Sequence, residues 1–250
     1  MIAGSLFKNA GGGMAKTGGY IVGRKDLIER ISYRFTVPGL GGAEGATFGS
    51  LRDMFQGFFI SPQTTGNAIK GAIFEAALLE ELGLSVSPKW DAPRTDLIQT
   101  VNFGNPDDMI KFAAAIQANS PIDSFVTPIP ETMAGYEDPV IMAGGSFVSG
   151  STTEFSGDGP LREPYTLYMQ GGLTFAHVKV AIIGPPKPPS LIKNNRVIGS
   201  TLVMELNLFF DWKTMRSIWH NHEAKMLTPT KNLDKISRNP NIENDSFTFF

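Results

Sequence analysis

Residues 5–20 read SLFKNAGGGMAKTGGY, and this stretch carries more chemical information than any other part of the 250-residue chain. Lys8 follows a segment of mostly small residues and precedes three consecutive glycines at positions 11–13. Because glycine lets the backbone bend tightly and lets a planar ligand approach closely, the pattern favours an amine presented on a loop. A lysine presented in this way is typical of enzymes that form a Schiff base with a carbonyl group held beside it.

Two other interpretations of this stretch are open. One is a solvated surface lysine, since Lys8 is one of 22 Lys and Arg residues. The other is a phosphate-binding loop, because Lys16 and Thr17 follow glycines. The Walker A pattern requires glycine immediately before its lysine and again six residues before it, and these positions hold Ala15 and Ala10. The sequence therefore argues against nucleotide hydrolysis.

Composition bounds the class of protein. The chain is 42% hydrophobic and 18% charged, which suits a globular protein with a substantial core. A net charge of -2 gives no electrostatic reason to expect nucleic acid or an anionic membrane surface as a partner. No apolar run is long enough to predict a membrane span, and residues 1–20 lack a signal-peptide pattern. We expect a soluble protein; the cytoplasm is the favoured compartment, although the sequence does not fix it.

Reactive side chains other than lysine are few. The absence of cysteine excludes disulfides and thiol nucleophiles. His220 and His222 lie in the tail without acidic residues at ligand spacing, so we expect no metal site, and His177 is interpreted as a packing or helix-surface residue rather than a general base. No Gly-x-Ser-x-Gly motif stands between a predicted strand and helix, which argues against a serine hydrolase. Arg162 lies between two prolines, and a guanidinium held stiffly in this way suits a bidentate carboxylate contact.

The periodicity around this stretch predicts an α/β or α+β protein in which strands and helices alternate. Pro62 is expected to end one helix, Gly83 to cap the next, and Asn105 with Pro106 to begin a third. The predicted helices are 24–34, 51–59, 67–82, one starting at 106, and 174–183; the predicted strands are 20–23, 96–103, 124–127 and 165–170, with a β-rich segment at 140–155 and a rigid polar turn at 156–164.

The same patterns predict three regions. Residues 1–84 would form the remnant of a large domain and residues 85–183 an α+β small domain. Residues 184–250 begin with a proline-rich linker and carry a net charge of +3 from residue 187, against -5 for residues 1–186. Since residues 232–250 show little periodicity, we expect this tail to be disordered.

Eight stretches, in order along residues 3–183, closely resemble the methionine gamma-lyase family, whose members are often called aluminium resistance proteins. They are SLFKNAGGG at 5–13, TGGYIVGR at 17–24, SPKW at 87–90, PRTD at 93–96, DSFVTP at 123–128, GYED at 135–138, DGPLREPY at 158–165 and QGGLT at 170–174. The resemblance implies the C-terminal portion of an aspartate aminotransferase-like architecture, which is fold type I of the enzymes that use pyridoxal phosphate.

By this resemblance Lys8 carries the pyridoxal phosphate as a Schiff base and moves the Cα proton, and Arg162 binds the carboxylate of a small amino-acid substrate. The implied reaction is elimination of a thiol from a sulfur amino acid, of the methionine gamma-lyase or cystathionine beta-lyase type. The motifs do not distinguish β from γ elimination. The family also implies a homo-oligomer whose sites are completed by a neighbour, and the glycine-rich loop at 39–49 is the candidate for reaching across.

The chain departs from the family pattern in two places. The family has a long segment before the lysine that binds the cofactor phosphate and ring, and nothing in this chain matches it. The tail after Ile183 does not match either. We therefore expect a truncated chain that is inactive alone. Two alternatives are a non-catalytic remnant or interaction subunit of a full-length paralogue, and a transaminase that uses pyridoxal phosphate.

Overall fold

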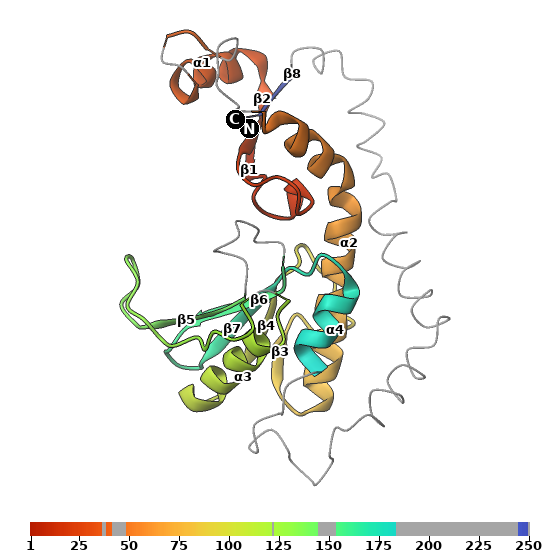
Figure 1. Ribbon diagram of the computed structural model, residues 1–250, viewed down its shortest axis with the longest axis vertical. Coiled ribbons are helices and arrows are strands. Elements are labelled where there is room, and N and C mark those ends of the chain that lie inside the picture. The colour runs from red at the N-terminus through yellow and green to blue at the C-terminus, as the bar shows by residue number, and fades with distance from the viewer. Residues whose placement is uncertain (37–38, 42–48, 122, 145–153, 184–244, 250) are drawn as a thin grey trace, which may run out of the picture.

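The computed structural model describes residues 1–36, 39–41, 49–121, 123–144, 154–183 and 245–249 (Figure 1). Within them the chain is a mixed α/β protein with two antiparallel sheets and four α-helices, as expected at this coarse level. In order, the elements are β1 (Ile2–Ser5), the 3-10 turn η1 (Asn9–Gly11), β2 (Gly19–Arg24), α1 (Lys25–Phe35), α2 (Leu51–Glu81), β3 (Ser85–Ser87), β4 (Gln99–Asn102), α3 (Pro106–Ala118), β5 (Val140–Ala143), β6 (Ser156–Pro160), β7 (Thr166–Gln170), α4 (Phe175–Ile183) and β8 (Asp245–Phe249).

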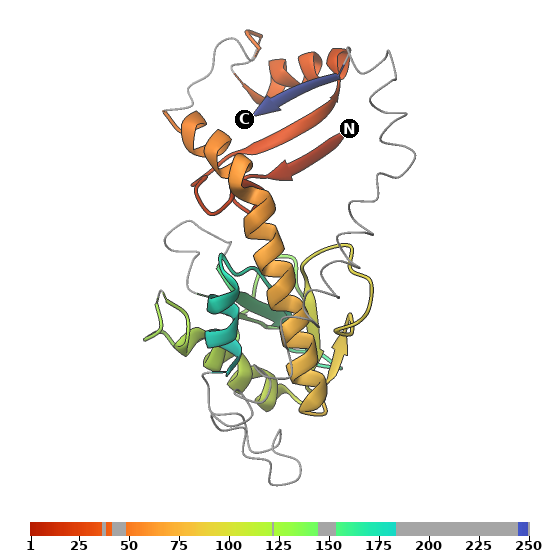
Figure 2. The same cartoon turned by 90° about the vertical axis from the view of Figure 1, so that its right-hand side faces the viewer.

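These elements form two lobes connected by one helix. The N-terminal lobe contains β1, η1, β2, α1 and β8, and the sheet lobe contains β3 to β7, α3 and α4. Helix α2 runs from the first lobe into the second (Figure 2). None of the helices that the structure describes is both long and apolar enough to cross a membrane.

The N-terminal lobe is built on a three-stranded sheet of order β1-β2-β8. Ile21 at its centre pairs with Ala3 on one side and with Thr248 on the other. The expectation of a disordered tail is therefore wrong for residues 245–249. The segment Ser246-Phe247-Thr248-Phe249 alternates polar and aromatic residues, which suits a strand, but its partner lies more than 200 residues away. Residues 184–244 lie outside the described part of the chain.

Helix α2 continues through Pro62, where the sequence predicted a break. Proline cannot donate the backbone hydrogen bond that the carbonyl of Phe58 would otherwise accept. The Ser61 hydroxyl donates to this carbonyl instead, at 2.9 Å, so the group remains satisfied and the helix is not interrupted. At the other end Gly83 has a φ of 80°, the left-handed cap that the sequence predicted.

The sheet lobe is built on a five-stranded antiparallel sheet of order β3-β4-β7-β6-β5. Its inner face carries buried side chains such as Val101, Leu167 and Ile141, which pack with α3, α4 and the C-terminal half of α2 in the main core. The other face, which we call the outer face, carries alternate residues of the same strands. Neither view shows a described helix on the outer face, and η1 lies on the side of the sheet opposite α3 (Figures 1 and 2).

Three predicted elements differ in the structure. Residues 124–127 form no strand, and Phe125 is 85% exposed. The first part of the predicted turn at 156–164 is strand β6, and the turn itself follows at 161–165. The strand was missed because Gly157 and Gly159 conceal its alternation of inward and outward side chains. Strand β4 begins at Gln99, since Asp96 Oδ1 accepts from the Ile98 amide and forms a local turn. The cap of α3 is as predicted, with Asn105 Oδ1 accepting from the Asp108 amide at 2.9 Å.

Candidate functional site

The loop that carries Lys8 is anchored on both sides of the lysine. Leu6 is only 1% exposed and packs with Ala15 and Met54, while its amide donates to the Gly18 carbonyl at 2.9 Å. Lys8 itself has an extended backbone and immediately precedes η1, and its carbonyl accepts from the Gly11 amide. Its side chain is exposed. The amine is thus held out from a loop whose backbone is fixed.

Two of the three glycines after Lys8 serve to pack this loop against α2. A Cβ on Gly12 would lie 2.4 Å from the carbonyl oxygen of Gly57, and one on Gly57 would lie 2.0 Å from the carbonyl oxygen of Gly11. Gly12 also has a left-handed φ of 62°. Because these are contacts between backbones, no side chain fits at either position. Only Gly13 remains exposed and available to a ligand in the way the sequence suggested.

The acidic group that interacts electrostatically with Lys8 is Asp158, from the opposite lobe. Burial raises the pKa of Asp158 above its usual value, and the positive charge of Lys8 opposes this rise. Lys8 makes no ion pair within 4 Å among the described residues. Sequence analysis placed Asp158 in a turn and gave it no role. In the structure Gly157 and Gly159 are buried, so Asp158 between them belongs to the outer face, a placement that could not be read from the sequence alone.

Arg162 lies in the turn between β6 and β7. Its amide donates to the Pro160 carbonyl at 2.9 Å, and its carbonyl accepts from the Tyr165 amide at 2.6 Å. This agrees with the stiff backbone that the flanking prolines suggested. The side chain is exposed, and it makes no ion pair among the described residues. Its role as a carboxylate ligand therefore stays a prediction, as does that of Lys8.

A second charged group, Arg94, is buried beneath α2. Its Nη2 donates to the Ala72 carbonyl at 3.3 Å and to the side-chain oxygen of Gln99, whose own amide donates to the Pro88 carbonyl. Burial raises the pKa of Glu75 to about 8, and the positive charge of Arg94 opposes the rise. The pKa of Arg94 is lowered by burial, against the attraction of Glu75. The hydrogen bonds of Arg94 therefore connect the segment before β4 to α2.

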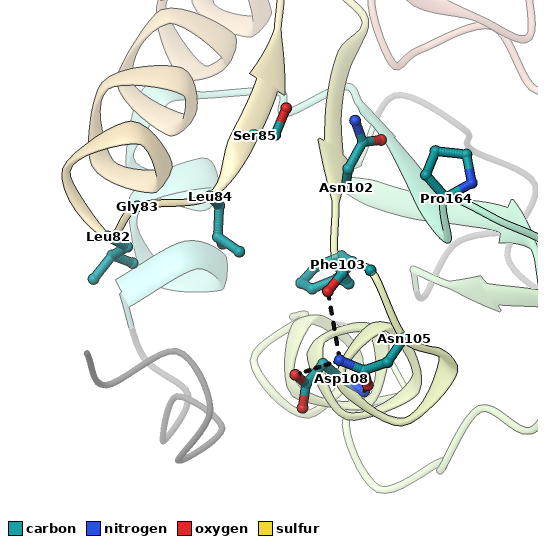
Figure 3. Close-up of a pocket in the computed structure, with 10 residues that line it drawn as sticks. Leu82, Gly83, Leu84, Ser85, Asn102, Phe103, Asn105, Asp108 and Pro164 are labelled. Atoms are coloured by element: carbon teal, nitrogen blue, oxygen red, sulfur yellow. Dashed lines mark hydrogen bonds between the residues drawn. The ribbon is translucent and has the colours of Figure 1, made fainter.

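A cavity of about 460 Å³ opens at the far end of α2 (Figure 3). Two of its polar side chains already serve the cap of α3, since Asn105 Nδ2 donates to Asp108 Oδ2 at 2.9 Å. Neither Lys8 nor Arg162 contributes to it; the lining residues are Leu82, Gly83, Leu84, Ser85, Asn102, Phe103, Gly104, Asn105, Asp108 and Pro164. The cavity is therefore not the site that the sequence predicted.

A primary amine such as that of Lys8 has the chemistry to hold an aldehyde cofactor. Within the described part of the chain no cluster of three His, Asp or Glu side chains could hold a metal ion. The histidines at 220 and 222 lie outside that part, and His177 is half-buried on α4. Lys8, in contrast, offers an exposed amine on a fixed backbone with the exposed Gly13 nearby.

Known proteins with similar sequences share about 180 residues with this chain. A family model described as methionine gamma-lyase matches residues 1–185. The uncharacterised 33.9 kDa protein from the glnA 5′ region of Lactobacillus delbrueckii subsp. bulgaricus is 62% identical over 180 residues, which cover 72% of this chain and 59% of that protein. The uncharacterised protein YnbB of Bacillus subtilis is 56% identical over 182 residues, which cover 73% of this chain and 43% of YnbB.

Two solved structures extend the likeness to the fold. A carbon-sulfur lyase involved in aluminium resistance from Clostridium novyi has 52% identity and a TM-score of 0.67, with 72% of this chain and 42% of that chain covered. A Bacillus cereus protein has 57% identity and a TM-score of 0.69, with 73% and 45% covered. The chain thus spans about half the length of the relatives it matches.

Proposed function

The chain belongs to the methionine gamma-lyase family, and on this premise we propose that its residues serve a pyridoxal-phosphate-dependent carbon-sulfur lyase that acts on a sulfur amino acid. The observation that carries the proposal is Lys8: an exposed amine, on a loop fixed against α2, inside the matched residues 1–185. Likeness to the Clostridium novyi lyase supports the reaction class. The aspartate aminotransferase-like architecture, fold type I, is part of the same proposal.

The named residues have distinct roles in this proposal. Pyridoxal phosphate, when bound, supplies an electron-withdrawing system that weakens the bonds at the substrate Cα. Lys8 Nζ would hold the cofactor at its aldehyde carbon, and the same amine would move the proton at the substrate Cα. The Arg162 guanidinium holds the substrate carboxylate through parallel hydrogen bonds. The Leu6 anchor and the glycine contacts with α2 hold the backbone from which the Lys8 side chain extends.

The cofactor role of Lys8 can be tested without turnover. The purified chain is mixed with pyridoxal phosphate, the adduct is reduced with borohydride, and labelled peptides are identified by mass spectrometry. We expect the label at Lys8 in preference to Lys16, which is also exposed and provides an internal reference. A Lys8→Ala variant should lose this label and keep the background labelling elsewhere. Equal labelling of Lys8 and Lys16 would contradict the assignment.

The reaction class requires a separate product assay. Elimination from Cβ leaves pyruvate, ammonia and a thiol, whereas elimination from Cγ leaves 2-oxobutanoate with the same two products. A transaminase would release an oxo acid without a thiol and would need an acceptor oxo acid. Labelling at Lys8 with no product from cystathionine or methionine would favour the non-catalytic alternative for this chain. The two assays therefore separate binding of the cofactor from catalysis.

A further inference from the structure

Asp158 occupies the middle of a row of residues on the outer face. The antiparallel register pairs Asp158 with Met142 on β5 and with Tyr168 on β7. The row continues from Tyr168 to Thr100 on β4 and from Thr100 to Ser87 on β3. Asp158 is the ionisable carboxyl of this row, because the remaining members are Met142, Tyr168, Thr100 and Ser87.

Some polar side chains of the outer face are hydrogen-bonded, whereas Asp158 has no hydrogen-bond partner among the described residues. Thr100 Oγ1 donates to the Ser87 carbonyl at 2.9 Å, and Thr166 Oγ1 donates to Asn102 Oδ1 at 2.6 Å. Among the described residues no hydrogen bond reaches the Asp158 carboxylate, although this residue is partly buried. A partly buried carboxylate without hydrogen bonds favours a cation as its partner.

The Lys8 ammonium can serve as this cation, because the loop that carries it lies on the same side of the sheet as Asp158. Both views place η1 on the outer side of the five-stranded sheet (Figures 1 and 2). Helix α2 fixes this arrangement at two points, since Gly57 contacts the loop and a Cβ on Gly71 would lie 2.5 Å from the side chain of Val178 in α4. Helix α2 therefore contacts both the loop that carries Lys8 and the lobe that carries the outer face.

We propose that Asp158 is a positioning residue for Lys8, and that its carboxylate attracts the Lys8 ammonium and holds the amine over the outer face of the sheet. The electrostatic effect of Lys8 on Asp158 agrees with this arrangement. The inference rests on the loop and the sheet and does not need lyase activity to hold.

The test measures how readily Lys8 reacts with a small neutral aldehyde. The full chain is methylated with formaldehyde and cyanoborohydride at a fixed pH, and the ratio of labelling at Lys8 to labelling at Lys16 is read by mass spectrometry. Asp158→Asn removes the attraction that favours the ammonium form, so the ratio should rise about two- to four-fold, as expected for a partly screened charge pair. Asp107→Asn, at an exposed acid on α3 across the sheet, should leave it unchanged.

A second measurement covers the case in which Asp158→Asn disturbs folding. Lys8 is exposed, so Lys8→Met should fold normally. Removal of the positive charge should raise the pKa of Asp158 further, which carbon-13 NMR of the side-chain carboxyl would report. An unchanged Asp158 titration, or an equal change in labelling ratio in both Asp variants, would overturn the proposal. Neither outcome would bear on whether the family protein is a lyase.

Discussion

At the scale of single residues, Glu75 makes the strongest prediction about stability. Its pKa is raised to about 8 in the folded chain by burial, whereas an exposed glutamate has a value near 4.5. The folded state then binds more protons than the unfolded state between these values, so the free energy of unfolding should fall as the pH rises from about 5 to about 8. The loss should be of the order of 3 kcal/mol and should level off above pH 8.

Glu75→Gln removes the titrating group and keeps its size, so it should flatten this pH dependence. Denaturant unfolding of both proteins across the pH range provides the measurement. Glu29→Gln is the matched control, because Glu29 is exposed on α1 and should leave the pH profile unchanged. If the free energy of unfolding of the parent protein rose between pH 5 and 8, the raised pKa of Glu75 would be contradicted.

At the scale of elements, α2 contains three glycines with different surroundings. A Cβ at Gly57 would meet the Gly11 backbone at 2.0 Å, one at Gly71 would meet Val178, and one at Gly66 would meet nothing within 4 Å. Gly57→Ala should therefore destabilise the chain by roughly 2–3 kcal/mol, because neither backbone can move away cheaply. Gly66→Ala should stabilise it by up to about 1 kcal/mol, since alanine has the higher helix propensity.

Each of these two variants adds one methyl group to the same helix, at different positions, which makes them a matched pair. The midpoint temperature of thermal unfolding should fall in Gly57→Ala and rise in Gly66→Ala. The ratio of aldehyde labelling at Lys8 to that at Lys16 should change in Gly57→Ala and stay constant in Gly66→Ala. Similar behaviour of the two variants would mean that the loop does not depend on its contact with α2.

At the scale of the whole molecule, β8 brings the last described residues onto the first sheet (Figure 1). A two-stranded hairpin is only marginally stable in water, so β1 and β2 should depend on this third strand. Deletion of residues 245–250 should speed amide hydrogen exchange in β2 and leave exchange in α3 unchanged. Exchange followed by mass spectrometry gives the comparison directly. Equal protection of β2 in both chains would argue against the pairing.

Local signals in the sequence predicted the elements whose ends are fixed locally. Asn105 and Pro106 correctly predicted the start of α3, and Gly83 correctly predicted the end of α2. The continuity of α2 was missed because it depends on the Ser61 hydroxyl, and β6 was missed because Gly157 and Gly159 hide the alternation. Lys8 could be singled out as a candidate from its glycines. Asp158 could not, because its relation to Lys8 arises only when the two lobes are placed together.

The contacts at Gly57 and Gly71 give α2 a mechanical consequence. The two positions are 14 residues apart, or about 21 Å along a helix that rises about 1.5 Å per residue. A helix of this length resists compression, so it acts as a spacer between the reactive amine and the sheet. Any narrowing of that distance must come from bending. A bend costs least free energy between Pro62 and Gly66, because Pro62 has no backbone N–H to donate and Gly66 has no Cβ.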